Sequence, residues 1–284
     1  MVFRLDYGRL LLHICQRADS EKKPMERLKR SMLLAVPVLM LMACVGPLPA
    51  DDDQDGFYSY RPATRGGTGK VYMGREISQF LSYHGIPWLE RDDRLETEKP
   101  DEVVARLGLE ADDVVADIGA GSGYFTYRLA RLVPEGRVLA VDIQPEMLEA
   151  IEKRRDSLGL KNIEPVLGSI EDPSLPEGVV DLVLMVDAYH EFSHPREMGE
   201  GIVRSLAPGG RVVLVEYRGE DRFSNIHPLH KMTEKQVKRE LSALGLVWQE
   251  TLDFLPEQHV IIFTLASTAA SVAEAAGGKA DESP

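Results

Sequence analysis

The sequence predicts an α/β protein built on a doubly wound, mostly parallel seven-stranded sheet. Between residues 101 and 265, short apolar runs alternate with amphipathic stretches. The apolar runs are continuous, which indicates strands covered on both faces, and strand–helix alternation is typical of a parallel sheet. A glycine-rich turn follows the first of these strands, at the edge where doubly wound sheets bind ligands.

The predicted elements follow one another in a regular order. Strands are expected over 114–118, 137–143, 163–167, 179–186, 211–217, 246–253 and 260–265, and helices over 124–133, 145–158, 195–206 and 233–244. Pro145 suits a first helical turn, and Gly159 and Gly245 suit helix ends. Because no helix separates the last two strands, we expect them to form an antiparallel pair at the edge of the sheet.

Residues 57–100 precede this domain and are expected to form an N-terminal helical cap. Tyr72 to Tyr83 is the stretch predicted as a helix, and a charged stretch begins at Trp88. The cap could cover the open end of the sheet, or its helix could simply pack on the core.

Charge is distributed unevenly along the chain. Of its 284 residues, 33 are Lys or Arg and 46 are Asp or Glu, a formal net charge of −13. The first 43 residues nevertheless hold eight basic and four acidic residues. An acidic body repels phosphate, so we expect no nucleic-acid partner. Two cysteines cannot form a disulfide framework.

The N-terminal segment, residues 1–43, has the pattern of a signal segment. Lys29 and Arg30 precede an apolar run from Met32 to Met42, which is too short to span a membrane. The run ends in Leu-Met-Ala-Cys, which resembles a bacterial lipobox. That resemblance implies cleavage before Cys44, lipidation of Cys44 and a lipid-anchored protein of the bacterial cell envelope. An uncleaved hydrophobic helix, a cleaved soluble precursor and a cytoplasmic protein with an incidental lipobox are the alternatives.

Two further segments are predicted to lie outside the core. Residues 44–56 are interpreted as an acidic tether, because the calcium-loop spacing that begins at Asp51 has Pro62 where the ligating Glu should stand. Residues 267–284 are rich in Ala, Ser and Gly and are expected to be a disordered tail. The folded domain is therefore expected over 101–266.

The glycine-rich turn has the spacing D-x-G-x-G-x-G, from Asp117 to Gly123. A dinucleotide loop needs G-x-G-x-x-G, and Tyr124 stands where its last glycine should be. A carboxylate at Asp117 suits a cationic ligand better than a pyrophosphate. The next strand ends at Asp142, where an acidic side chain can accept hydrogen bonds from both hydroxyls of a ribose.

In this order and spacing, the sequence resembles the class I S-adenosylmethionine-dependent methyltransferases over roughly residues 101–265. The matching segments are Asp117–Gly123, Val141–Ile143, Gly168–Asp172, Asp181–Asp187 and Leu206–Gly210. The resemblance implies a Rossmann-like methyltransferase fold and S-adenosyl-L-methionine as the cofactor.

The family implies a role for each matched position. The glycine backbone would contact the methionine part, Asp117 would shape that loop, Asp142 would bind the ribose, Ser169 and Ile170 would face the adenine, and Asp187 would lie near the sulfonium. Many members have Asp where this chain has Ser169. The implied cofactor-binding residues are Asp117, Gly119, Gly121, Gly123, Asp142, Ile143, Ser169, Ile170 and Asp187.

A second motif, H-E-x-x-H, runs from His190 to His194. On a helix this spacing holds zinc, but here it follows a buried strand, and Pro195 disfavours helical geometry at His194. We therefore predict no metal. His190 and Tyr189 are interpreted as candidate catalytic residues on the loop after the fourth strand, with His190 as a general base; the alternative is that both only shape the pocket.

The predicted function is S-adenosylmethionine-dependent methyl transfer to a small-molecule acceptor. The alternative is an envelope lipoprotein that binds S-adenosylmethionine or another nucleoside without catalysis. A nicotinamide-dependent dehydrogenase is disfavoured by the glycine spacing and by the absence of Tyr-x-x-x-Lys near the fourth strand.

Overall fold

The computed structural model describes residues 56–266. The predicted signal segment, the lipidation site at Cys44, nearly all of the acidic tether and the predicted C-terminal tail lie outside these residues. Among the helices described, none combines the length and the apolar character needed to cross a bilayer.

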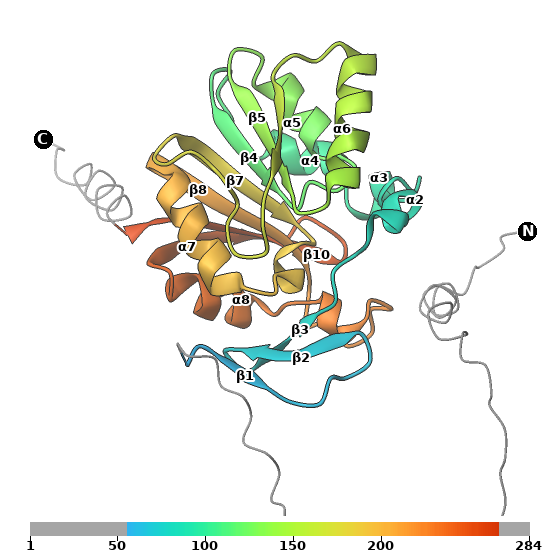
Figure 1. Cartoon of the computed structure of the whole chain (residues 1–284), viewed down its shortest axis with the longest axis vertical. Helices are drawn as coiled ribbons and strands as arrows, with labels where there is room; N and C mark the ends of the chain where they lie inside the picture. Colours follow the sequence, from blue (N-terminus) through green and yellow to red (C-terminus); the bar gives the residue numbers. More distant parts are fainter. Residues whose placement is uncertain (1–55, 267–284) are drawn as a thin grey trace, which may run out of the picture. The chain divides into compact units, whose positions relative to one another are not determined.

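The core is a seven-stranded sheet in the order β6-β5-β4-β7-β8-β10-β9 (Figure 1). Its strands are β4 (Val114–Ile118), β5 (Arg137–Asp142), β6 (Ile163–Leu167), β7 (Val180–Val186), β8 (Leu206–Tyr217), β9 (Leu246–Leu252) and β10 (Gln258–Leu265). The first five are parallel, and β10 runs antiparallel to both β8 and β9. The predicted fold and its antiparallel edge pair are confirmed.

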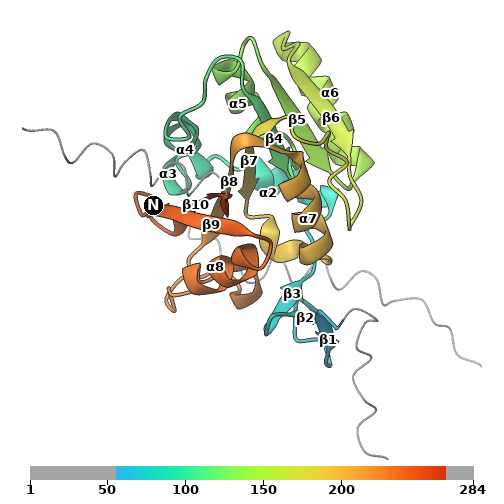
Figure 2. The same ribbon diagram turned by 90° about the vertical axis from the view of Figure 1, so that its left-hand side faces the viewer.

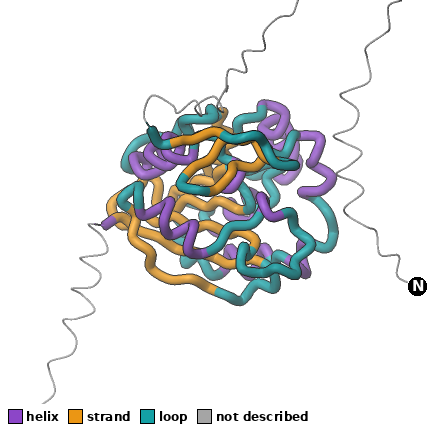
Figure 3. The backbone as a smooth tube through the Cα atoms, turned by 90° about the horizontal axis from the view of Figure 1, so that it is seen from below, coloured by secondary structure: helices purple, strands orange, loops and turns teal. Residues whose placement is uncertain are grey.

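Helices cover both faces of this sheet (Figures 2 and 3). On one face pack α4 (Pro100–Ala105), α5 (Thr126–Leu132) and α6 (Pro145–Leu158). On the other face pack α7 (Pro195–Ser205) and α8 (Glu234–Ser242). Both faces of the central strands are therefore buried, which explains their continuous apolar sequence.

Local sequence sets the ends of several helices. Pro145 occupies the first turn of α6, and Gly159 closes that helix at φ +67°. The Thr233 hydroxyl caps α8 by accepting a hydrogen bond from the backbone N–H of Gln236. Pro145 and Gly159 explain why the predicted bounds of α6 agree with the structure.

The helix predicted from Tyr72 to Tyr83 is wrong. Residues 58–78 form a separate antiparallel sheet of three strands, β1 (Tyr58–Tyr60), β2 (Gly67–Tyr72) and β3 (Arg75–Ser78). Met73 and Gly74 both have positive φ, +46° and +85°, and make a two-residue turn that pairs Tyr72 with Arg75. Such a turn ends any helix at this point.

The helical part of the N-terminal region is therefore confined to residues 83–105. It consists of the 3₁₀ turn η2 (Tyr83–Gly85), α2 (Ile86–Leu89), α3 (Arg94–Thr97) and α4. Residues 81–98, which we call the cover segment, lead from the small sheet past the carboxyl ends of the parallel strands, and Gln144 and Ser122 there hydrogen-bond to it.

Candidate functional site

The glycine loop after β4 has a backbone that only glycine adopts readily. Gly119, Gly121 and Gly123 have φ of +72°, +56° and +81°. A Cβ on Gly119 would lie 2.7 Å from the Cβ of Ala188, on the loop after β7. The glycines therefore serve both the turn itself and its close approach to the neighbouring loop.

Asp142, the last residue of β5, is bonded directly to this loop. Its Oδ2 accepts a hydrogen bond of 2.9 Å from the N–H of Gly121, and its Oδ1 accepts one of 2.9 Å from the N–H of Gln144. Burial raises the pKa of the carboxyl group, against the lowering effect of these N–H donors. The structure thus brings together two positions that lie 21 residues apart in the sequence.

Asp117 lies beneath the same loop. Its Oδ2 accepts a 2.6 Å hydrogen bond from the Thr126 hydroxyl, which joins the end of β4 to the first residue of α5. The side chain is buried, and burial raises its pKa from 3.8 to about 6. The role of Asp117 in shaping the loop stays a prediction.

The loop after β6 reaches the same edge of the sheet through its backbone. The N–H of Gly168 donates to the carbonyl of Asp142 over 3.0 Å. The Ser169 hydroxyl accepts from the N–H groups of Glu171 and Asp172, so it stabilises its own turn. Ile170 is 48% exposed beside it, and Ile143 follows Asp142 in the next loop. Ser169 and Ile170 are therefore accessible, as a residue facing the adenine must be.

Asp187 is a buried carboxyl group at the end of β7, with φ of +48°. Its Oδ2 accepts a 2.8 Å hydrogen bond from the amide of Gln258 on β10, whereas no described residue hydrogen-bonds to its Oδ1. Burial and the nearby Glu98 raise its pKa well above the usual value. A cationic ligand would satisfy this orphaned oxygen.

The two predicted catalytic residues, Tyr189 and His190, lie on the 3₁₀ turn η3 (Tyr189–Glu191), which begins two residues after Asp187. His190 is 2% exposed, and burial lowers its pKa to about 4. Its Nδ1 lies 2.6 Å from Oε2 of Glu216 and its Nε2 lies 3.1 Å from Nδ1 of His230. Tyr189 is buried, with its ring packed edge-on against Phe192. Their role in proton transfer stays a prediction.

Hydrogen bonds join the cover segment to the carboxyl edge of the sheet, among them those of Gln144 and Ser122. The side-chain amide of Gln144 accepts from the N–H of Tyr83 and donates to the carbonyl of Leu81. The Ser122 hydroxyl, within the glycine loop, donates to Glu90 over 2.6 Å. These contacts hold the segment against the glycine loop.

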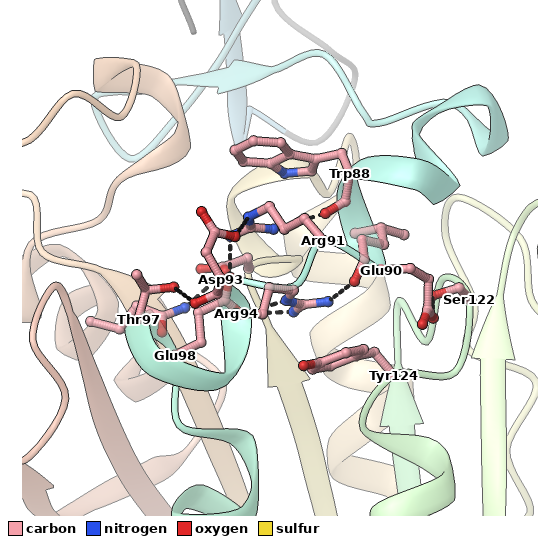
Figure 4. A network of polar contacts seen from close by, with 12 residues as sticks. Trp88, Glu90, Arg91, Asp93, Arg94, Thr97, Glu98, Ser122 and Tyr124 are labelled. Carbon is pink, nitrogen blue, oxygen red and sulfur yellow. Dashed lines mark hydrogen bonds and ion pairs between the residues drawn. The ribbon is translucent and has the colours of Figure 1, made fainter. Parts of the chain in front are cut away.

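An arginine organises the segment from within (Figure 4). Arg94 is 5% exposed, donates to the carbonyl of Leu89 and pairs with Glu98, and its guanidinium lies 4.1 Å from the ring centroid of Tyr124. Arg91 also pairs with Glu98 and lies over the ring of Trp88. No sequence pattern predicts this cluster; the charged stretch that begins at Trp88 is the signal that points to it.

Between the cover segment and the glycine loop remains a cavity of about 40 Å³. Its lining combines predicted cofactor residues with cover-segment side chains: Leu89, Arg94, Asp117, Gly119, Ala120, Gly121, Ser122, Tyr124, Phe125 and Val186. Ligand pockets for small molecules measure about 300–1,000 Å³. The cavity beneath the cover segment is therefore too small for a whole nucleoside cofactor.

The residues at this edge fit S-adenosylmethionine chemically. The loop glycines allow close backbone approach, Asp142 ends the strand next to β4, and the unpartnered oxygen of Asp187 suits a cation. Fold and site together define a protein that binds a nucleoside cofactor at the carboxyl edge of a doubly wound sheet.

Residues 109–259, more than half of the chain, match the model of a methyltransferase domain family. The chain therefore belongs to this family. A crystal structure of a SAM-dependent methyltransferase from Aquifex aeolicus superposes with a TM-score of 0.61 at 26% identity, covering 65% of this chain and 98% of that one. Family and structure confirm S-adenosylmethionine as the cofactor.

Curated relatives match over part of their length. An uncharacterised methyltransferase-like protein of Schizosaccharomyces pombe is 30% identical, covering 50% of this chain and 53% of that protein. The ubiquinone/menaquinone biosynthesis C-methyltransferase UbiE of Pseudomonas putida is 32% identical, covering 39% of this chain and 44% of that enzyme. The chain thus spans about half the length of these relatives.

Proposed function

We propose that this protein is an S-adenosylmethionine-dependent methyltransferase that acts on a small-molecule acceptor. The observation that carries the proposal is the direct hydrogen bond between Asp142 and the N–H of Gly121. It joins the ribose-binding position and the methionine-binding loop into one unit, as a cofactor that spans both requires.

Each residue of the site has a separate task in this proposal. Gly119 and Gly121 admit the methionine part of the cofactor, and Asp142 accepts hydrogen bonds from the ribose. Asp187 offers its free oxygen to the positive charge. When bound, the cofactor supplies an activated methyl group, so the protein's main contribution is to position the acceptor in line with it.

The cover segment must open for the cofactor to enter. Leu89 lies so close to the glycine loop that a Cβ on Gly121 would lie 2.8 Å from its Cδ1. Closure over the loaded site would then exclude water from the reacting groups. Opening would break the hydrogen bonds that Gln144 and Ser122 make to the segment and would move α2 and α3, which have four residues each.

Two observations bear on the class of acceptor, the name of one relative and the net charge of the chain. The Pseudomonas putida relative is named for quinone biosynthesis. The net charge of −13 disfavours a nucleic-acid substrate. A general base is needed only if the acceptor must lose a proton, and neutral His190 is the candidate for that task.

The test is a calorimetric titration of the full chain with S-adenosylmethionine and S-adenosylhomocysteine. We expect micromolar binding, and roughly 10–100-fold weaker binding by Asp142→Ala, because charge-assisted hydrogen bonds are lost. Glu152→Ala, an exposed acid on α6, is the matched control and should bind normally.

Three outcomes would decide between the alternatives. Absence of binding to folded protein would contradict the methyltransferase proposal. Equal loss of binding in both variants would remove Asp142 from the site. Tight binding with no methyl transfer to any acceptor in a screen would favour a non-catalytic binding protein.

We also propose that the chain is exported and anchored to the cell envelope through lipidated Cys44. The proposal rests on the lipobox-like residues 41–44. Expressed in bacteria with radiolabelled palmitate, the wild type should carry label and fractionate with membranes, whereas Cys44→Ala should do neither. Unlabelled wild-type protein in the cytoplasmic fraction would contradict the anchor.

A further inference from the structure

Three side chains that commonly bind metals converge beside the cofactor edge. His190 and Glu191 lie on η3, and His230 ends the 3₁₀ turn η4 (Pro228–His230), 40 residues further on. Nε2 of His190 and Nδ1 of His230 are 3.1 Å apart. Oε1 of Glu191 lies 3.9 Å from the first and 3.7 Å from the second.

These separations are close to those of a tetrahedral metal site. Ligand atoms at the usual zinc distances of about 2.0–2.2 Å lie roughly 3.3–3.6 Å from one another. The two imidazole nitrogens are already near this spacing, and the carboxylate oxygen needs to move by only a few tenths of an ångström. Two imidazoles and one carboxylate are a ligand set that suits zinc and other divalent transition metals.

Two of the three candidate ligands are each held by a polar contact on the side that faces away from the cluster. Glu216, fully buried on β8, lies 2.6 Å from Nδ1 of His190, which leaves Nε2 to face the cluster. The N–H of Leu81 donates to Oε2 of Glu191, which leaves Oε1 to face the imidazoles. Carboxylate-to-histidine contacts of this kind hold the rings of metal-binding histidines in place.

The site is reachable from solvent on one side. The side chain of His230 is 33% exposed and that of Glu191 is 18% exposed, whereas His190 is buried. The nearby Arg75 is paired through two hydrogen bonds with Glu240, which offsets its positive charge.

We propose that His190, Glu191 and His230 bind one divalent transition-metal ion, with Zn²⁺ as the ion to test first; while the ion is bound, His190 serves as a ligand and not as a general base. The site differs from the H-E-x-x-H reading of the same residues. His194 is the N-cap residue of α7, and its Nε2 lies 3.7 Å from Oε1 of Glu171, while His230 takes the place of His194 as the second histidine. Three protein ligands leave one coordination position for water or for a donor atom of a small molecule.

The test uses the full chain after treatment with a chelator. Zn²⁺ is titrated calorimetrically, and Co²⁺ is titrated while its visible absorption is followed. We expect one equivalent of either ion and the strong visible bands of tetrahedral Co²⁺. His230→Ala and Glu191→Gln should each lose this uptake, and Glu216→Gln should weaken it roughly 10–100-fold.

His194→Ala is the matched control, because it removes the other histidine of the motif and should bind normally. Circular dichroism and S-adenosylmethionine titration establish that each variant is folded. The proposal is overturned if the wild type takes up neither ion, or if the folded Glu191→Gln or His230→Ala protein takes up as much as the wild type. Loss of binding in His194→Ala, or a thiolate charge-transfer band with Co²⁺, would also overturn it.

Discussion

Asp117 is a buried carboxyl group in the candidate site, and its ionisation lowers the stability of the folded protein. Its carboxyl group is buried and receives one short hydrogen bond, from Thr126. Burial raises its pKa from 3.8 to about 6, so ionisation at neutral pH is less favourable in the folded protein than in the unfolded chain. A cationic cofactor nearby would compensate for this charge.

We predict that Asp117→Asn becomes increasingly stable relative to wild type as pH rises from 4 to 7. In this window the unfolded wild-type chain binds fewer protons than the folded one, so its free energy of unfolding falls with pH, by up to roughly 3 kcal/mol for a shift of about two pKa units. Urea unfolding of the cofactor-free protein at several pH values measures the difference. Asp156→Asn, on the surface of α6, should track the wild type throughout. If the difference in free energy of unfolding between Asp117→Asn and wild type does not change with pH, the pKa of Asp117 in the folded protein is close to its usual value.

Several site residues could be predicted from sequence because their role depends on the local conformation of the backbone. Gly119 and Gly121 need positive φ, and Asp142 ends a strand, so spacing alone located them. Gln144 and Gln258 could not be found in this way. Their side chains act on partners 61–71 residues away, and no local pattern encodes such a pairing.

At the level of elements, the cover segment is built from pieces too short to be stable alone. α2 and α3 have four residues each, and polar contacts around Arg94 and Glu98 hold them (Figure 4). Such segments unfold or move at low free-energy cost. The cover segment is thus suited to admit a cofactor and close again.

We predict that Leu89→Ala binds S-adenosylmethionine about 3–10-fold more tightly than wild type. The half-buried Leu89 fills space over the glycine loop, and removing it lowers the free energy of opening by about 1 kcal/mol. Calorimetry and stopped-flow measurements give the affinity and the association rate. Leu95→Ala, at an exposed position of α3, should leave both unchanged. Weaker binding by Leu89→Ala would instead indicate that Leu89 contacts the bound cofactor.

For the molecule as a whole, a buried ion pair joins the small sheet to the main domain. Arg75 on β3 donates two hydrogen bonds of 2.9 Å to Glu240 on α8 and a third to the carbonyl of His190. The Glu240 side chain has no solvent exposure. Tyr58 on β1 adds a hydrogen bond to Glu197 on α7. The three-stranded sheet is therefore attached to the main domain through α7, α8 and the loop after β7.

We predict that Arg75→Met destabilises the protein by about 3–5 kcal/mol, because it leaves the Glu240 carboxylate buried without its partner. The double variant Arg75→Met/Glu240→Met should recover most of this loss, since neither charge then remains. Urea unfolding of wild type, both single variants and the double variant completes the cycle. Additive losses would show that the two side chains do not interact.

Local sequence patterns were enough to predict the parallel sheet, the bounds of β4, β6 and α6, and the loop from Asp117 to Gly123. These features depend on apolar periodicity, Pro and Gly punctuation and strand ends, all of which are local. Three features could not be predicted in this way: residues 58–78 form strands, Leu89 and Arg94 cover the cofactor edge, and His230 rather than His194 faces His190. These depend on contacts between segments far apart in the chain, whose free energy no local pattern records.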